Sequence, residues 1–321
     1  MKRNVILDLP EVGWSDPVRQ NEFVLSVISA LTAFGEKLDY DHVCAVSGCA
    51  FRTSFSVTGW NHGNYHVIHT PCVIEHTFRM LGYKITRRRR SGFEEDKKMI
   101  TDSIDRGIPV ITLEGVINCS DACIIAGYDD EGGVLLGYSP FMHIPDDHGE
   151  PHDKTGYFRK TNWHEGFSAR GSRLNIITVD EKCGRPSDED IFGETLKTAA
   201  SLIGSERMSE GQHNGIMAHK AFANALLTYD WEDNFEPYLN VMCNFMQYLD
   251  KRYAVRYLSE NGRRDLASYY SKITELTDRL AEIIPQDFTA SGLFGDKENL
   301  KPFAQTLLRI ADLEDEFVRM I

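Results

Sequence analysis

The chain has 321 residues with 48 acidic and 35 basic side chains, which gives a formal net charge of −13 at pH 7. Hydrophobic residues make up 42% and charged residues 26%, a mixture typical of globular proteins and not of disordered ones. The acidic balance argues against a broad surface for nucleic acid or anionic lipid, because both of these partners are themselves negative. We therefore expect neither nucleic acid nor a membrane among the partners.

We recognise no targeting signal in the sequence, and together with the cysteine content this favours a cytoplasmic location. No apolar run approaches the roughly 20 residues that a membrane-spanning helix needs. The N-terminal sequence reaches Pro10 and Glu11 before any signal-like apolar stretch develops. Seven cysteines are an odd number, and their spacing does not resemble the disulfide framework of a secreted domain. We expect reduced thiols and no cofactor.

Two helical segments come first in the chain. Residues 21–34 carry apolar side chains at 3.6-residue spacing and stop at Gly35, a residue type that often follows a helix. Residues 71–81 follow Thr70, a natural N-cap, and end at Gly82. These patterns predict one helix over 21–34 and another over 71–81.

From about residue 105 to residue 180 the pattern changes to short runs of strand length and composition, separated by turns. The predicted strands are 109–113, 122–128, 134–138, 156–160 and 173–179. A glycine-containing turn at 129–133 joins two of them as a hairpin. Helices followed by an antiparallel sheet predict an α+β domain over residues 1–182.

The remainder of the chain, residues 183–321, is predicted to be an all-α domain. Apolar side chains recur at alternating steps of three and four residues in 231–249, 266–283 and 300–317, and more weakly in 190–203 and 213–229. Four or five helices of this kind form a bundle or a helical cap. Such a domain could also mediate a homo-oligomer.

Several landmarks occur in one order along residues 5–180. A helix closing with Leu-Thr-Ala-Phe-Gly at 31–35 leads to Val-Ser-Gly-Cys-Ala-Phe-Arg at 46–52; Met-Leu-Gly-Tyr at 80–83, Ile-Asp-Arg-Gly-Ile-Pro-Val at 104–110 and Ile-Ile-Ala-Gly-Tyr-Asp-Asp at 124–130 follow. This order resembles the N-terminal domain family of the butirosin-biosynthesis acyltransferase, which has a papain-like cysteine-peptidase fold. The resemblance implies a papain-like N-terminal domain with a helical companion.

Thiol chemistry on that fold needs a cysteine at the start of the first helix, a histidine on the first hairpin strand and an acid on the next strand. The sequence departs from all three requirements. The first position falls within residues 21–23, and no cysteine precedes Cys44. Asp121 stands near the place of the histidine, and Ser139 stands near the place of the acid. The resemblance therefore implies a scaffold whose catalytic triad is lost.

The expected function is the binding of a small molecule, or of an acyl or peptidyl group, in the former catalytic cleft. Gly48 permits close backbone approach, and Arg52 offers a planar fork for a carboxylate or phosphate. The predicted ligand-binding residues are Ser47, Gly48, Arg52, Asp121, Tyr128 and Ser139. A simpler explanation is that Gly48 makes a turn and that Arg52 forms a structural ion pair.

Two enzymatic alternatives stay open. A thiol-dependent amidase or acyltransferase would use Cys49 or Cys72 as nucleophile, and Cys72 lies at the second position of a capped helix, where a thiolate is stabilised. Its base would be one of four histidines, His62, His66, His69 or His164. Each cysteine is also explained as a small buried apolar residue.

A metal-dependent enzyme is the second alternative. The candidate ligands are His62, His66 and His69, with Cys72 and His76 close by, and these donor types suit zinc, nickel or copper. Their spacing matches no zinc motif, so histidines scattered over a loop explain them better than a metal site does. The basic run Arg87–Arg90 could contact an anion, although a solvated strand end accounts for it more simply.

Overall fold

The computed structural model describes residues 2–16, 18–56, 71–113, 116–117, 122–143, 152–164, 174–205, 207–209, 212–228, 241, 244–284 and 297–321. Contacts divide the chain into two compact units. Unit 1 comprises residues 1–43 and 78–186, and unit 2 comprises residues 44–77 and 187–321. The second boundary is close to the one expected at residue 183. Residues 44–77, however, group with the helical C-terminal part and not with the rest of the N-terminal part.

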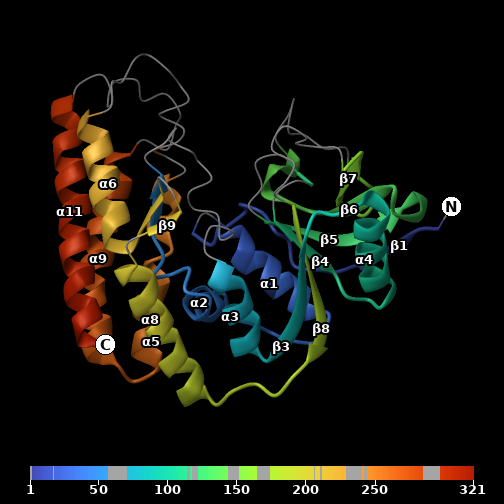
Figure 1. The fold of residues 1–321 in the computed structure, drawn as a ribbon, viewed down its shortest axis with the longest axis horizontal. Coiled ribbons are helices and arrows are strands. Elements are labelled where there is room, and N and C mark those ends of the chain that lie inside the picture. Colours follow the sequence, from blue (N-terminus) through green and yellow to red (C-terminus); the bar gives the residue numbers. More distant parts are fainter. Residues whose placement is uncertain are drawn as a thin grey trace. The chain divides into compact units, whose positions relative to one another are not determined.

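Unit 1 contains an antiparallel sheet (Figure 1). Among the described residues its strands follow the order β3-β8-β4-β5-β6-β7, and β1 pairs with β5. The bounds are β1 Asn4–Val5, β3 Tyr83–Arg89, β4 Val110–Leu113, β5 Ala122–Asp129, β6 Val134–Tyr138, β7 Phe158–Thr161 and β8 Asn175–Lys182. Every pairing is antiparallel, which confirms the α+β class.

Two helices of unit 1 pack against the central strands. α1 (Glu22–Thr32) contacts β4 and β5, and α4 (Phe93–Asp105) contacts β4, β5 and β8. All four residues of β4 and the first seven of β5 are buried, as expected for strands covered on both faces. Ile100 and Ile104 of α4 share a core cluster with Cys123 and Ile125, which are alternate residues of β5. Side chains alternate along a strand, so α4 covers one face of β5 only.

The predicted helix over 21–34 corresponds to α1, and local sequence accounts for both of its ends. The Asn21 side chain accepts a hydrogen bond from the Val24 amide at 3.2 Å and caps the first turn. Gly35 has a φ of +77°, a conformation that few residues other than glycine adopt without strain, and it follows the last turn. The predicted helix over 71–81 is α3 (Pro71–Leu81), which ends in the same way at Gly82.

Unit 2 is mainly helical, as predicted. α6, α9 and α11 lie side by side, and α8 packs against α9 (Figure 1). The bounds of the helices are α2 Tyr40–Val46, which begins in unit 1, α5 Asp188–Gly204, α6 Gly215–Thr228, α8 Arg252–Glu260, α9 Arg264–Ile283 and α11 Lys297–Met320. The predicted apolar stripe over 300–317 is the buried face of α11. Much of the predicted stripe over 231–249 lies outside the described residues.

The expectation that residues 183–321 would contain helices alone is wrong. β9 (Arg207–Ser209) and β10 (Gln212–Asn214) form a short hairpin between α5 and α6. β10 also pairs with β2 (Ser54–Ser56), a strand from the segment that joins unit 2 from the N-terminal part. Strands of three residues are too short to show a period of two, so the pattern of hydrophobicity did not reveal them.

Candidate functional site

The first residue of α1 and the first residue of β5 meet in unit 1. Glu22 is 3% exposed, and its Oε2 accepts a hydrogen bond from the Ala122 amide at 2.9 Å. The preceding residue, Asn21, donates its backbone N–H to the Tyr40 hydroxyl at 3.0 Å. A buried carboxylate therefore lies at the helix start, where the resemblance to papain-like enzymes requires a thiol.

Of the other two positions implied by the resemblance, Ser139 lies at the same end of the sheet. Ile124 of β5 pairs with Tyr138 of β6, and continuing that register places Cys123 opposite Ser139. Ser139 is 1% exposed, and its hydroxyl accepts a hydrogen bond from the Phe141 amide at 3.2 Å. Asp121 lies outside the described residues. This end of unit 1 thus combines the Glu22 carboxylate with the Ser139 hydroxyl.

Tyr128 does not share this end of the sheet. It lies six residues beyond Ala122 on β5, and at about 3.3 Å per residue the two are separated by roughly 20 Å. Its hydroxyl donates to Asp105 Oδ1 at 2.7 Å, and burial together with Asp105 raises the pKa of Tyr128. Tyr128 therefore does not line one cleft with Ser139.

The predicted binding loop at residues 47–52 belongs to unit 2 and is a tightly packed turn after α2. The Ser47 hydroxyl donates to the Cys44 carbonyl at 3.0 Å and accepts from the Cys49 amide at 3.3 Å. Gly48 has a φ of +81°, and a Cβ there would lie 2.6 Å from Leu202 Cδ1 of α5. The glycine thus allows a turn and a close helix contact, which is the simpler of the two explanations.

Arg52 and Cys49 are both buried, at 3% and 2% exposure. A ligand could reach the Arg52 guanidinium, or a substrate the Cys49 thiol, only after this part of unit 2 moved. Cys72 lies in the first turn of α3, and the described part of the chain does not include its side chain. The geometry of this loop therefore gives the thiol-enzyme alternative no added support.

His164 has both ring nitrogens engaged. Its Nε2 lies 3.0 Å from Asp96 Oδ2, and its Nδ1 lies 3.3 Å from Arg90 Nη2. A guanidinium only donates, so Nδ1 accepts and Nε2 carries the proton. Asp96 is fully buried; burial alone would raise its pKa, but hydrogen bonds from Ser91, His164 and Arg88 outweigh that effect and lower it. His164 thus serves a structural cluster.

The same cluster explains most of the basic run 87–90. Arg87 Nε donates to Asn175 at 3.3 Å, Arg88 Nη2 to Asp96 at 2.8 Å, and Arg90 contacts His164. Only Arg89 of the four is exposed. These side chains connect β3 to β8 and to the start of α4, so the run is a strand end in which three arginines make structural contacts and only Arg89 matches the expected solvated side chain.

The predicted metal ligands His62, His66 and His69 lie outside the described residues. His76 is described, and its Nδ1 lies 3.4 Å from the Thr198 hydroxyl. Within the described ranges, no three His, Cys, Asp or Glu side chains converge as a metal site would require. The metal-enzyme alternative remains an expectation from sequence.

A groove of about 650 Å³ lies between α4 and the β3–β8 edge of unit 1, lined by Thr86, Arg88, Met99, Asp102, Asp105, Arg106 and Thr178. Its charged groups already have protein partners. Arg88 pairs with Asp96, Asp102 accepts from Lys98 at 2.6 Å, and Asp105 accepts from Asn4 and Tyr128. Among the charged lining residues, Arg106 is the one without a partner named here, so the groove offers few polar groups to a ligand.

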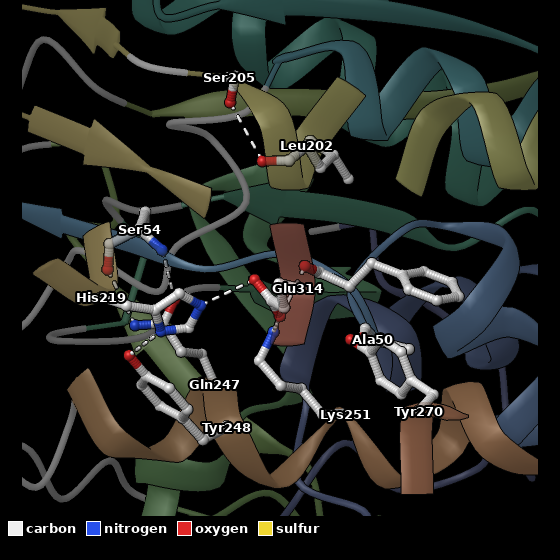
Figure 2. A network of polar contacts seen from close by, with 11 residues as sticks. Ala50, Ser54, Leu202, Ser205, His219, Gln247, Tyr248, Lys251, Tyr270 and Glu314 are labelled. Carbon is white, nitrogen blue, oxygen red and sulfur yellow. Dashed lines mark hydrogen bonds and ion pairs between the residues drawn. The ribbon is translucent and has the colours of Figure 1, made fainter. Parts of the chain in front are cut away.

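Unit 2 contains a buried polar network that the sequence patterns did not reveal (Figure 2). His219 Nε2 lies 2.8 Å from Glu314 Oε2, Lys251 Nζ lies 2.6 Å from Glu314 Oε1, and His219 Nδ1 lies 2.9 Å from the Tyr248 hydroxyl. All four side chains have 0% exposure. The carboxylate requires the proton of His219 on Nε2, so Nδ1 accepts from Tyr248.

Electrostatics within this network favour one ionised pair. Burial would raise the pKa of Glu314, but Lys251 and His219 outweigh it and lower that pKa to about 2. Burial lowers the pKa of His219, against the opposing influence of Glu314. Burial and Glu314 both raise the pKa of Tyr248. At neutral pH the network therefore contains an ionised Glu314 in contact with Lys251, a neutral imidazole and a neutral phenol.

The network is joined to the segment that follows the predicted binding loop. The Gln247 side chain accepts from the Ser54 amide at 2.8 Å and donates to the Ser54 carbonyl at 2.9 Å (Figure 2). The Tyr270 hydroxyl donates to the Ala50 carbonyl at 3.3 Å, and the Gly215 amide donates to the Thr53 carbonyl at 2.8 Å. Residues 50–54 are therefore fixed by side chains and backbone from the helical part of the same unit.

One sequence signal could have revealed this network. Glu314 lies four residues after Ile310 and three before Phe317, so it falls on the apolar stripe of 300–317. A charged residue on a buried stripe requires a buried partner. The identity of that partner could not be read from the sequence, because Lys251 and His219 are 63 and 95 residues away.

None of the helices described here is long and apolar enough to cross a membrane. A scan against protein-family models finds no match for this chain. A search of curated proteins also finds no match.

Proposed function

We propose that the chain binds a small molecule, or an acyl or peptidyl group, on a papain-like scaffold in unit 1 that does not perform thiol chemistry. The observation that carries the proposal is the place of Glu22 at the start of α1, held by the Ala122 amide at the start of β5. The resemblance places the nucleophile of a papain-like enzyme within residues 21–23, and Glu22 brings a carboxyl group to that stretch. The place of α1 ahead of the main strands of unit 1 and the antiparallel sheet are consistent with that scaffold.

The chemistry of this end of unit 1 favours a ligand with N–H donors. A carboxyl oxygen accepts hydrogen bonds from N–H donors, and the contact is strongest when the donor or the acceptor is charged. Ser139 adds a hydroxyl at the same end of the sheet. Glu22 and Ser139 are 3% and 1% exposed, so a ligand would reach them only after this end of unit 1 opened, just as Arg52 requires movement in unit 2. A peptide amide or a primary amine fits this combination better than an anion does.

The test measures binding by isothermal titration calorimetry. The probes are N-acetyl dipeptide amides for a peptidyl ligand and N-acetylcysteamine thioesters for an acyl ligand. We expect at least one probe to bind, and we expect Glu22→Gln to weaken that binding about tenfold or more because a charge-assisted hydrogen bond is lost. The matched control is Glu95→Gln, which neutralises an exposed carboxylate on α4 and should leave the affinity unchanged.

The same probes test the thiol-enzyme alternative. We expect no product from the amide or the thioester by mass spectrometry. Turnover that disappears in Cys49→Ser or Cys72→Ser would overturn the proposal and support an amidase or acyltransferase. Binding that is equally strong in the Glu22→Gln protein would show that the ligand site is elsewhere.

A further inference from the structure

The network around Glu314 is closed to solvent and has one titratable position that can change its charge near neutral pH. Lys251 and Glu314 balance each other, and His219 is neutral. A proton added to His219 would have to go to Nδ1, which accepts from Tyr248. That proton would turn an acceptor into a donor facing a hydroxyl, and it would leave a net positive charge in a fully buried cluster.

Few other charges near α6 could compensate for that proton. α11 contributes Glu314, and the segment before α8 contributes Tyr248 and Lys251. β2 is Ser-Phe-Ser and has no titratable group, whereas β10 carries the half-buried His213. The charged residues of α5 (Asp188, Glu189, Asp190, Glu194 and Lys197) are exposed or partly exposed. Asp250, in the segment before α8, is also buried, but Glu314 is the carboxylate that contacts His219 in the described part of the chain, and Lys251 already shares it.

Residues of the network and their neighbours also hold the β2 segment, residues 50–56, against the helices of unit 2. Gln247 binds both backbone groups of Ser54 and precedes Tyr248 in the chain, and Lys251 Nζ also lies 3.5 Å from the Phe51 carbonyl. Phe55 of β2 stacks on Phe222 of α6 at a centroid distance of 4.8 Å. A displacement of His219 or Lys251 would thus loosen both α6 and the segment 50–56.

We propose that the buried His219–Glu314–Lys251–Tyr248 network is a proton-sensitive lock: protonation of His219 in mildly acidic solution opens unit 2 between α6 and α11 and releases the β2 segment. This control is separate from the ligand binding proposed for unit 1. It gives the residues 47–55, which are buried in the closed form, a route to solvent that depends on pH.

The direction of the effect follows from the pKa of His219, which burial lowers in the closed form. An opened form has the ordinary value of 6.5, so it binds the proton more readily than the closed form does. Protonation of His219 therefore does not oppose closure above pH 6.5. Below pH 6.5 the opening constant, the ratio of opened to closed protein, rises by at most about tenfold per pH unit. Glu314 affects the opening constant only below pH 4.5. Its pKa has the ordinary value of 4.5 in an opened form and is about 2 in the closed form.

Hydrogen exchange of the full chain at pH 7.5 and pH 5.5, corrected for intrinsic exchange rates, measures this opening. We expect the opening constants of amides in Ser54–Ser56 and α6 to rise up to about tenfold at pH 5.5. In His219→Gln the amide group can donate to Glu314 and accept from Tyr248 but cannot titrate, so the rise should vanish. His213→Gln, in β10, is the matched control and should keep the rise.

A second variant keeps the proposal testable if His219→Gln folds poorly. Tyr248→Phe removes the donor that stabilises the unprotonated Nδ1, so the opening constant should be higher at pH 7.5. The closed form then accepts the proton more readily, so the rise between pH 7.5 and pH 5.5 should be smaller than in the unaltered protein. Opening constants that do not change with pH in the unaltered protein, or that rise equally in His219→Gln, would overturn the proposal. A pH dependence unaltered by Tyr248→Phe would do so as well.

Discussion

Replacing Lys251 with methionine is expected to destabilise the protein by about 3–5 kcal/mol, because it leaves a buried carboxylate without its cation. Both Lys251 and Glu314 have 0% exposure, and their charged atoms are 2.6 Å apart. Methionine preserves most of the volume of the lysine stem, so the loss reports on charge more than on packing. Urea denaturation followed by far-ultraviolet circular dichroism measures the change in the free energy of unfolding.

An exposed ion pair on α11, the helix that carries Glu314, provides the control for this substitution. Lys301 pairs with Glu298 at 2.5 Å at the start of α11, and the two side chains are 53% and 70% exposed. Lys301→Met should therefore change stability by less than about 1 kcal/mol. The double variant Lys251→Met/Glu314→Leu should be more stable than Lys251→Met alone, since no buried charge remains. Equal costs for Lys251→Met and Lys301→Met would contradict the buried ion pair.

Replacing Gly215 with alanine is expected to cost about 3 kcal/mol or more, because backbone strain and steric overlap add at one position. Gly215 begins α6 with a φ of +48°, and a Cβ there would lie 1.9 Å from the Ile203 carbonyl oxygen. The Cβ would also lie 2.7 Å from the Leu202 carbonyl oxygen. Both carbonyl groups belong to the backbone, which cannot move aside as a flexible side chain can. Thermal and urea unfolding of the variant would measure the loss.

Gly193 is the matched comparison for Gly215. It lies inside α5, and a Cβ there would meet no atom within 4 Å. Gly193→Ala should stabilise the protein by about 0.5–1 kcal/mol, because alanine loses less conformational freedom than glycine in a helix. A Gly215→Ala protein as stable as the unaltered one would show that α6 starts differently.

The sequence predicted most of the sheet and the longest helices because their periods extend over many residues. The strand predicted over 134–138 matches β6, and the stripe over 300–317 matches the buried side of α11. α4 was not predicted, since only Met99, Ile100 and Ile104 mark its apolar side in a polar segment. The grouping of 44–77 with unit 2 could not be predicted either, because it depends on contacts such as Ser54 with Gln247.

The candidate sites were harder to predict than the fold. The resemblance pointed to residues 21–23 and to the start of β5, and in the structure Glu22 contacts Ala122. It also suggested Tyr128, which a strand of eight residues carries to the opposite end of the sheet. Which end of a strand a side chain occupies follows from the register, and single-sequence patterns do not give the register.

The order in which unit 2 joins its parts matters for how the protein is made. Ser54 and Gln247 are 193 residues apart, and Ala50 and Tyr270 are 220 apart. At the usual elongation rates of about 5–20 residues per second, residues 50–56 leave the ribosome roughly 10–40 s before the helices that will hold them. During that interval Phe55 and the edges of β2 have no native partner. Contacts of such long range slow folding, so the completion of unit 2 is expected to be the last step of biosynthetic folding.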